Sequence, residues 1–223
     1  MKLTNALSKK ITRDWRAALE GFEVASSMNL ARRVGPFIQG ICLDRDSSNV
    51  TYLPTLYVHC LCRPFPVVSL SLGQPLLNLR SGTVERLKVQ SHEDFYQDAI
   101  NRTLSSSLLP TKGDWHLPQL VEAYERYRGM NRPDSRFPVH LWEDVVSAHA
   151  WAGAQVRASV LASKYIEVAE GWPKNVLERE GGIILWGERL KDLAISGDVH
   201  RLTVANEIVK LGLEGLPVSD LIP

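Results

Sequence analysis

The sequence lacks the features that mark secreted and membrane proteins. It has three cysteines in 223 residues, and no apolar run approaches the roughly 20 residues needed to span a bilayer. The start of the chain contains neither an uninterrupted apolar segment nor a small-residue cleavage site of the kind found in secretory signals. An odd number of cysteines without a signal is typical of free thiols in a reducing compartment. We therefore expect a cytoplasmic protein with no membrane partner.

The short motifs of common catalytic and cofactor sites are also missing. The sequence contains no G-x-x-x-x-G-K-[ST] or G-x-G-x-x-G loop for a nucleotide phosphate, no H-E-x-x-H zinc helix and no G-x-S-x-G serine elbow. No internal repeat is found at the spacing of solenoids or propellers. These absences favour binding over catalysis, and no cofactor is predicted.

Charge is unevenly divided along the chain. Residues 1–90 hold 12 Lys and Arg against 6 Asp and Glu, residues 91–223 hold 14 against 19, and a net charge of +6 is therefore followed by −5. Such a division indicates either a basic binding face or two halves that attract each other. Possible contacts to nucleic acid, weak and sensitive to salt, are Lys9, Lys10, Arg13, Arg16, Arg32 and Arg33.

The first ninety residues predict one helix followed by strands. Apolar residues recur every three or four positions from Leu3 to Phe22, which places them on one helical face, and Gly21 can end the helix. The polar run at 44–49 is typical of a hairpin loop. The segments 67–72 and 83–89 alternate apolar and polar residues and predict further strands.

From residue 91 the pattern is helical. Ser91 followed by Asp94 has the spacing of a capping box, residues 117–127 predict a helix, and residues 141–170 predict one long alanine-rich helix. Asp198 is expected to cap the last helix, and a short apolar tail follows. Strands followed by helices in blocks are typical of the α+β class. We expect an N-terminal amphipathic helix, a small mostly antiparallel sheet and a helical C-terminal half, with residues 1–90 and 91–223 packed as one domain.

One short stretch concentrates residues that can bind metal. His59, Cys60 and Cys62 lie within four positions, but in a regular strand the two cysteines share one face and the histidine takes the other. Zinc needs about four ligands, and the remaining cysteine, Cys42, can join only from a neighbouring strand. Free cysteine usually packs as a small hydrophobe. We interpret the stretch as a buried strand, and a metal site or a nucleophilic thiol stays open as an alternative.

A metal-dependent nuclease or hydrolase with a dispersed site is another possibility. Glu85 and Lys88, together with Asp44 or Asp46, loosely resemble such a core. The glutamate and the lysine are three positions apart, however, which puts them on opposite faces of a strand. No catalytic or metal-binding residue is therefore assigned.

Tryptophan and arginine, the residue types enriched at interaction hot spots, gather in the helical half. Trp142 and Trp151 are nine positions apart on one predicted helix, so they point to nearly opposite sides. Arg132 and Arg136 lie in the loop before that helix, and loops beside rigid helices often carry binding residues. These four residues are the predicted contacts to a protein partner.

The expected function is binding of another protein without catalysis, as an accessory or immunity-type subunit of a bacterial multi-protein system. Two alternatives stay open: the metal-dependent nuclease or hydrolase, and a nucleic-acid-binding protein that uses the basic N-terminal half. The sequence does not identify the partner.

Overall fold

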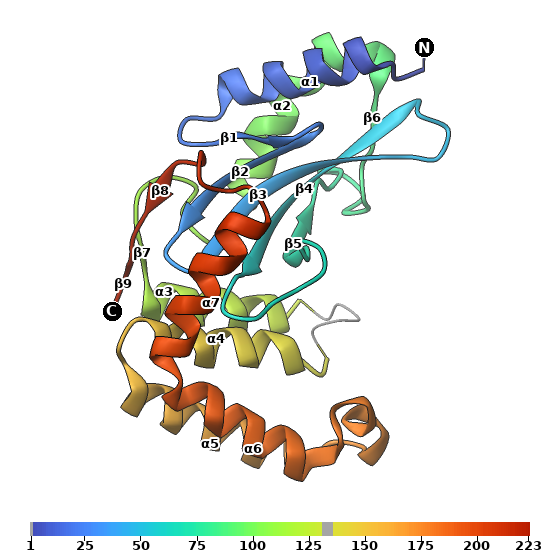
Figure 1. Cartoon of the computed structure of the whole chain (residues 1–223). Helices are drawn as coiled ribbons and strands as arrows, with labels where there is room; N and C mark the ends of the chain where they lie inside the picture. The colour runs from blue at the N-terminus through green and yellow to red at the C-terminus, as the bar shows by residue number, and fades with distance from the viewer. Residues whose placement is uncertain (1, 131–135) are drawn as a thin grey trace. The chain divides into compact units, whose positions relative to one another are not determined.

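The order of elements along the chain confirms the predicted α+β class. The computed structural model describes residues 2–130 and 136–223, and it contains an N-terminal helix, a mostly antiparallel sheet and a helical C-terminal half (Figure 1). The chain forms two compact units. Unit 1 consists of Met1–His59, Pro66–Asp114 and Gly212–Asp220, and unit 2 consists of Cys60–Phe65, Trp115–Leu211 and Leu221–Pro223.

Unit 1 is built on a sheet whose strands follow one another in chain order. Helix α1 (Asn5–Ala18) begins at Thr4, whose hydroxyl accepts the Leu7 amide at 3.3 Å. The sheet order is β1-β2-β3-β4-β5, with β6 paired to β4 and β8 paired in parallel to β2. The strand bounds are β1 (Glu23–Ser26), β2 (Asn29–Val34), β3 (Phe37–Arg45), β4 (Thr51–Cys60), β5 (Ser71–Pro75), β6 (Leu87–Lys88) and β8 (Val218–Ser219).

A continuous apolar core joins α1, the sheet and α2 (His92–Ser105). Trp15 from α1, Leu30 from β2 and Ile100 from α2 all belong to it and are at most 1% exposed. Each such side chain contributes roughly 1.5–3 kcal/mol through burial. This core fixes α1 by its apolar face and leaves the polar face of the helix toward solvent. The periodic pattern from Leu3 to Phe22 predicted this helix correctly.

The sheet ends in a short, exposed edge strand. Within the described part of the chain, β1 pairs only with β2, in antiparallel register, and the register shifts between Val24 and Ser26 as in a β-bulge. Val24, Ala25 and Ser26 are all exposed. A strand at the edge of a sheet has backbone N–H and C=O groups that no neighbouring strand uses. The β1 edge is therefore open to a further strand.

Unit 2 is helical, and the single helix predicted over residues 141–170 is wrong. The structure has two helices there, α4 (Val139–Trp151) and α5 (Gln155–Glu170). Gly153 lies between them with φ of +83°, a conformation that suits glycine and ends a helix. The other elements of this unit are β7 (Trp115–His116), α3 (Leu117–Arg128), α6 (Gly182–Ile195), α7 (Gly197–Lys210), β9 (Leu221–Ile222), and the 3₁₀ turns Lys174–Val176 and Glu178–Glu180.

Several smaller expectations also need correction. The strand expected at 67–72 begins only at Ser71, and that expected at 83–89 is reduced to Leu87–Lys88. The side chain of Ser91 makes no cap hydrogen bond, and the last helix is preceded by Ser196 instead of Asp198. The apolar tail contributes β8 and β9, two strands that local pattern did not predict. No helix among residues 2–130 and 136–223 combines the length and apolar character needed to cross a bilayer.

Candidate functional site

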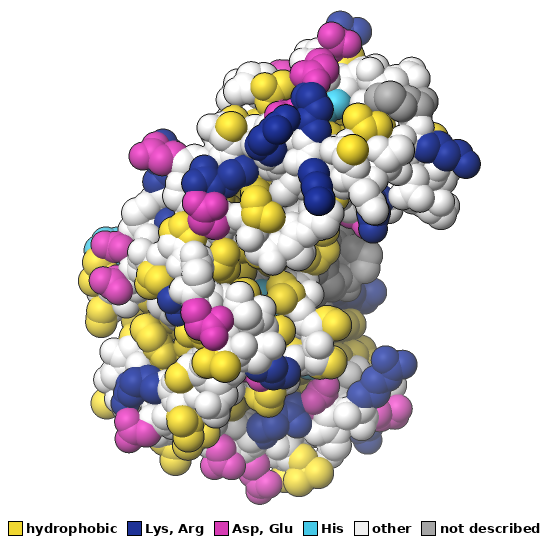
Figure 2. All heavy atoms as spheres, turned by 45° about the horizontal axis from the view of Figure 1, so that its top comes forward, with side chains coloured by type: hydrophobic (Ala, Val, Ile, Leu, Met, Phe, Trp, Pro, Cys, Tyr) yellow, Lys and Arg dark blue, Asp and Glu magenta, His cyan; other side chains and the backbone are white. Residues whose placement is uncertain are grey.

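A groove of about 520 Å³ lies in unit 1 between the polar face of α1 and the edge strand β1. From the helix it is lined by residues spaced so that they share one face. Val24 and Ser27 line the opposite side. Figure 2 shows Lys and Arg side chains gathered over α1. The helical residues of the groove are Asn5, Lys9, Thr12, Arg13 and Arg16.

Two of the three cations in the groove have little compensation from acidic groups. Lys9 makes no ion pair among the described residues, and Arg13 approaches only Asp14, at 3.9 Å, with three quarters of its side chain exposed. Arg16 forms an ion pair with Glu23 at the start of β1, and that hydrogen bond lowers the pKa of Glu23. Because opposite charge is scarce, the groove attracts anionic groups.

The floor of the groove is a buried hydroxyl that ties α1 to the sheet. Thr12 Oγ1 donates to the Ser8 carbonyl at 2.7 Å and accepts the Met28 amide at 3.1 Å. Met28, which joins β1 to β2, has φ of +62°, a conformation that is uncommon for a residue other than glycine. These hydrogen bonds hold the turn after β1 against α1 and so fix the position of the two walls of the groove relative to each other.

The other predicted nucleic-acid contacts lie outside this groove. Lys10 pairs with Asp14 and Glu93, which raises the Lys10 pKa. Arg32 is 3% exposed and donates to Gln39 at 2.8 Å and to the carbonyls of Pro110 and Gly113, both at 2.9 Å. Burial lowers the Arg32 pKa to about 10, so the group stays charged at neutral pH while it ties separate segments together. Arg33 is half-buried on β2.

Of the residues predicted to contact a protein partner, the structure buries one, half-buries another and leaves a third against a neighbouring ring. Trp142 is 3% exposed and stacks on Tyr165 with ring centroids 4.4 Å apart. Trp151 is half-buried at the end of α4. Arg136 lies over the Phe137 ring at 5.3 Å. Arg132 lies outside the described residues, so the structure does not place it.

The stretch around His59 is a buried strand, as predicted, but the strand ends at Cys60 and a turn follows. His59 is fully buried, and its Nδ1 accepts the Ser69 amide at 3.0 Å. All three cysteines are free, and Cys60 and Cys62 are buried. Burial raises the pKa of Cys60 well above its ordinary value, with a further contribution from its hydrogen bond to Cys62. A thiol held in this protonated form is a poor nucleophile.

The acidic residues weighed for a nuclease core are engaged in ion pairs or turns. Glu85 pairs with Arg102 at 2.9 Å, and Asp44 pairs with Arg86 at 3.0 Å. Asp46 accepts the amides of Val50 and Thr51 in the β3–β4 loop. Among residues 2–130 and 136–223, no group of three or more His, Cys, Asp or Glu side chains is arranged to hold a metal ion.

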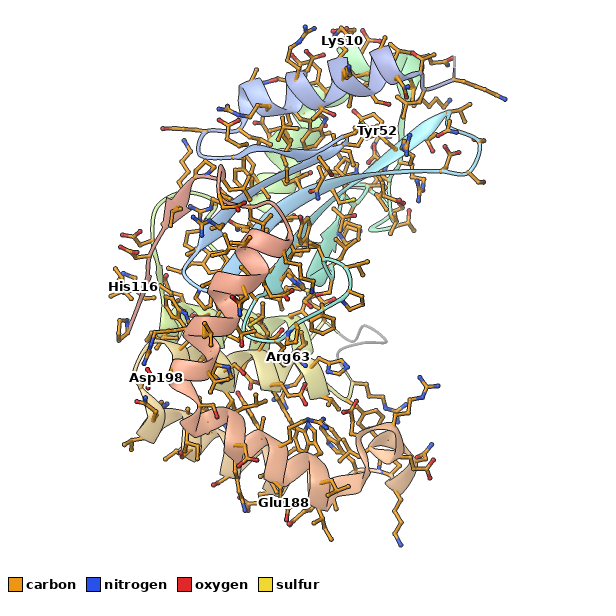
Figure 3. The ribbon with its side chains drawn as sticks, in the orientation of Figure 1. Lys10, Tyr52, Arg63, His116, Glu188 and Asp198 are labelled. Atoms are coloured by element: carbon orange, nitrogen blue, oxygen red, sulfur yellow. The ribbon has the colours of Figure 1, made fainter. Side chains whose placement is uncertain are left out.

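Sequence reasoning missed a buried polar chain in unit 1. Trp15 Nε1 donates to the Tyr52 hydroxyl at 3.4 Å, the Tyr52 hydroxyl is hydrogen-bonded to His92 Nδ1 at 2.7 Å, and His92 Nε2 lies 3.2 Å from Asp14. Tyr52 is labelled in Figure 3. The Asp14 carboxylate can only accept, so Nε2 carries a proton, and in the neutral histidine Nδ1 then accepts from the Tyr52 hydroxyl. Burial lowers the His92 pKa, against the opposing hydrogen bond to Asp14.

A second missed cluster lies in unit 2. Arg63, labelled in Figure 3, donates to Asp144 at 2.7 Å and also pairs with Glu143, and both carboxylates are nearly inaccessible. Burial raises the Asp144 pKa, and the Arg63 charge offsets this only in part. Burial also acts to raise the Glu143 pKa, but the hydrogen bond from His140 and the Arg63 charge outweigh it, and the pKa falls to about 2. Neither carboxylate lines the groove between α1 and β1.

Comparison of the chain with protein-family models, with curated proteins and with solved structures found no match. A function for the chain must therefore be argued from the chemistry and geometry of its own surfaces.

Proposed function

We propose that the protein is a non-catalytic binding subunit that captures an extended, acidic segment of another protein in the groove between α1 and β1. The observation that carries this proposal is the pairing of an open strand edge with a row of cations on the adjacent helix. The edge can accept a further strand through backbone hydrogen bonds, and the cations select its side chains. Strand addition of this kind is a common mode of peptide recognition.

The spacing of the cations matches an extended chain. Lys9 and Arg13 are four residues apart, which corresponds to about 6 Å along a helix. Alternate residues of a strand lie on one face about 6.6 Å apart. Two acidic residues separated by one position can therefore meet Lys9 and Arg13 together. From Asn5 to Arg16 the wall runs about 16 Å, the length of roughly five extended residues.

Charge favours an acidic partner over a second copy of this chain. Pairing two β1 edges would bring two rows of cations close together, and like charges across a strand pair are unfavourable. Positive charge beside an edge strand is one of the ways in which proteins prevent such self-association. An acidic segment would instead replace the missing counter-charge of Lys9 and Arg13.

Binding of nucleic acid remains the second candidate, because the same cations could contact phosphates. Phosphate contacts supply affinity in proportion to the number of charges neutralised. Arg32 is occupied by internal hydrogen bonds, and Lys10 is paired with two acids. The groove then offers only three cations, which supports a short acidic peptide better than a nucleic acid.

The cellular location, the accessory role and the partner contacts predicted from the sequence belong to the same proposal. Three free cysteines support a reducing, cytoplasmic location. An accessory or immunity-type role in a bacterial system rests on the character of the sequence alone. Trp142, Trp151, Arg132 and Arg136 stay predicted contacts to a partner, and Trp142 would take part only after its neighbours Tyr165 and Trp172 moved.

The test is selection from a displayed library of random peptides about ten residues long, the length of a long strand. The target is the full chain, and the comparison target is the double variant Lys9→Glu/Arg13→Glu. A matched control, Lys164→Glu/Arg179→Glu, reverses one lysine and one arginine at exposed positions of unit 2. Single-stranded oligonucleotides are titrated against the same three proteins.

We expect selected peptides to carry Asp or Glu at alternate positions and to bind the wild type and the control variant equally. Reversal of Lys9 and Arg13 should weaken binding by about tenfold or more, since each charge contact contributes up to about 1 kcal/mol and reversal adds repulsion. Peptides without acidic preference, or equal binding to all three proteins, would overturn the proposal. If oligonucleotides bind the wild type more tightly than the peptides do, and this binding is lost in Lys9→Glu/Arg13→Glu, nucleic-acid binding would be the better assignment.

A further inference from the structure

A second groove, also of about 520 Å³, lies within unit 2 where α3, α4 and the start of α5 meet. Its walls are apolar and include Leu117, Val121 and Ala154. Two charged residues of opposite sign, Glu122 and Arg157, also line it. They form no ion pair with each other or with another described residue. Concave, mostly apolar sites of this size with a few polar groups are typical of small-molecule sites.

His149 provides this groove with a hydrogen-bond acceptor. The side chain is 4% exposed, and its Nδ1 contacts the Val145 carbonyl at 2.9 Å. A carbonyl can only accept, so Nδ1 carries the proton and Nε2 is left as an acceptor. Nε2 has no partner among the described residues, while the ring lines the groove. Burial lowers the His149 pKa, and the Arg157 charge adds to this, so the ring is neutral.

The start of α5 lies beside His149, since the Ala154 amide donates to the His149 carbonyl at 2.8 Å, and it favours an anion. Helix α5 begins there, after Ala154, and no side chain caps its first turn. The first amides of a helix are free donors, and the helix dipole makes this end positive. Arg157 lies in the first turn and has no acidic partner among the described residues. The free amides and Arg157 together favour a carboxylate.

We propose that this groove binds a free α-amino acid with an apolar side chain. The ligand carboxylate would lie at Arg157 and the start of α5, and its ammonium group would donate to His149 Nε2 beside Glu122. The apolar side chain would pack on Leu117 and Val121. This assignment gives a role to each polar side chain of the groove, Glu122, His149 and Arg157, and is independent of peptide capture at β1.

The experiment is an NMR titration of the full chain with leucine, isoleucine, valine, methionine and phenylalanine. For a ligand of about nine heavy atoms, the usual efficiency of small ligands gives a Kd on the order of millimolar or tighter. For the amino acid that binds best, the amide and the analogue without the amino group are titrated as well. Each removes one charged contact and should bind about tenfold more weakly.

Three variants test the placement. Arg157→Gln should weaken binding about tenfold, and Val121→Trp should abolish it by filling the groove while the polar groups stay in place. Arg126→Gln, an exposed arginine of α3 that does not line the groove, is the matched control and should bind like the wild type.

The proposal is wrong if none of the five amino acids gives saturable shifts by about 20 mM, well above the expected Kd. It is equally wrong if Arg157→Gln and Val121→Trp bind like the wild type. Binding of the analogue without the amino group as tightly as its amino acid would also overturn the assignment, because His149 and Glu122 would then play no part.

Discussion

Replacement of Arg63 by methionine should destabilise unit 2 strongly. Methionine keeps much of the apolar stem and removes the charge. The Arg63 side chain is 17% exposed, whereas those of Glu143 and Asp144 are 2% and 3% exposed. Glu143 retains Arg189, at 3.0 Å, and the Trp186 indole, at 3.1 Å. Among the described residues, the side chain of Asp144 retains only the Tyr124 hydroxyl, at 3.5 Å. The cost of the change is therefore concentrated at Asp144.

The loss in the free energy of unfolding depends on which of two outcomes for Asp144 costs less free energy. A buried carboxylate left without its partner costs about 3–5 kcal/mol. Alternatively, Asp144 takes up a proton, which for an ordinary pKa of 3.8 costs about 4 kcal/mol at pH 7, at about 1.36 kcal/mol per pH unit, and less here because the Asp144 pKa is already raised. The expected loss in the free energy of unfolding at pH 7 is therefore about 3–4 kcal/mol. By the second route the loss is smaller at pH 5 than at pH 7.

The direction in which the stability deficit changes with pH follows from proton linkage. In the variant, the folded pKa of Asp144 lies above the unfolded pKa, so the native state binds more protons and the deficit grows as pH rises. Urea unfolding of the wild type and the variant at pH 7 and pH 5 measures the difference at each pH. Arg189→Met is the control, because Arg189 is 43% exposed and Glu143 then keeps Arg63. It should cost less than about 1 kcal/mol.

Addition of Asp144→Asn to Arg63→Met should restore most of the loss, because the buried charge is then gone. The reasoning is refuted if Arg63→Met costs no more than Arg189→Met, or if its deficit is the same at both pH values.

Two further predictions concern buried groups. The His92 pKa is lower in the folded than in the unfolded state, so the unfolded state binds more protons at acid pH, and the free energy of unfolding should be highest above about pH 6.5 and fall below it. Urea unfolding of His92→Gln should therefore show a weaker dependence on pH between 7 and 5 than that of the wild type. An unchanged dependence would contradict the assignment of a neutral histidine. The three thiols should be structural, so elemental analysis should find less than one zinc per chain; a tightly held, stoichiometric zinc that is lost in Cys60→Ser/Cys62→Ser would show that the alternative interpretation was right.

The sequence predicted elements whose signals are local. Leu3, Leu7, Ile11 and Trp15 specify α1 through one apolar face, and the polar run at 44–49 predicts the loop between β3 and β4. The break at Gly153 was missed because alanine continues on both sides of it and hides the change of helix. The strands β8 and β9 were missed because two residues carry no periodicity, and their pairing depends on segments far away in sequence.

The candidate sites depended on tertiary structure in the same way. Lys9, Arg13 and Arg16 were among the predicted possible contacts to nucleic acid, but nothing in their spacing indicates that an edge strand lies beside them. In the sequence, Glu143 and Asp144 have no feature that distinguishes them from other polar residues of a helix, because their partner Arg63 is about 80 positions away. The unpaired Nε2 of His149 depends on which side chains surround it, and that could not be predicted from the sequence.

The central claim is that an acidic segment adds as a strand to β1. Hydrogen–deuterium exchange of the full chain, with and without the tightest peptide from the selection, tests this most directly. If a strand is added, exchange of backbone amides at 23–26 should slow in the complex, because free edge amides become hydrogen-bonded. Protection that appears only along α1, with the amides of β1 exchanging as in the free protein, would contradict strand addition and reduce the groove to an electrostatic surface.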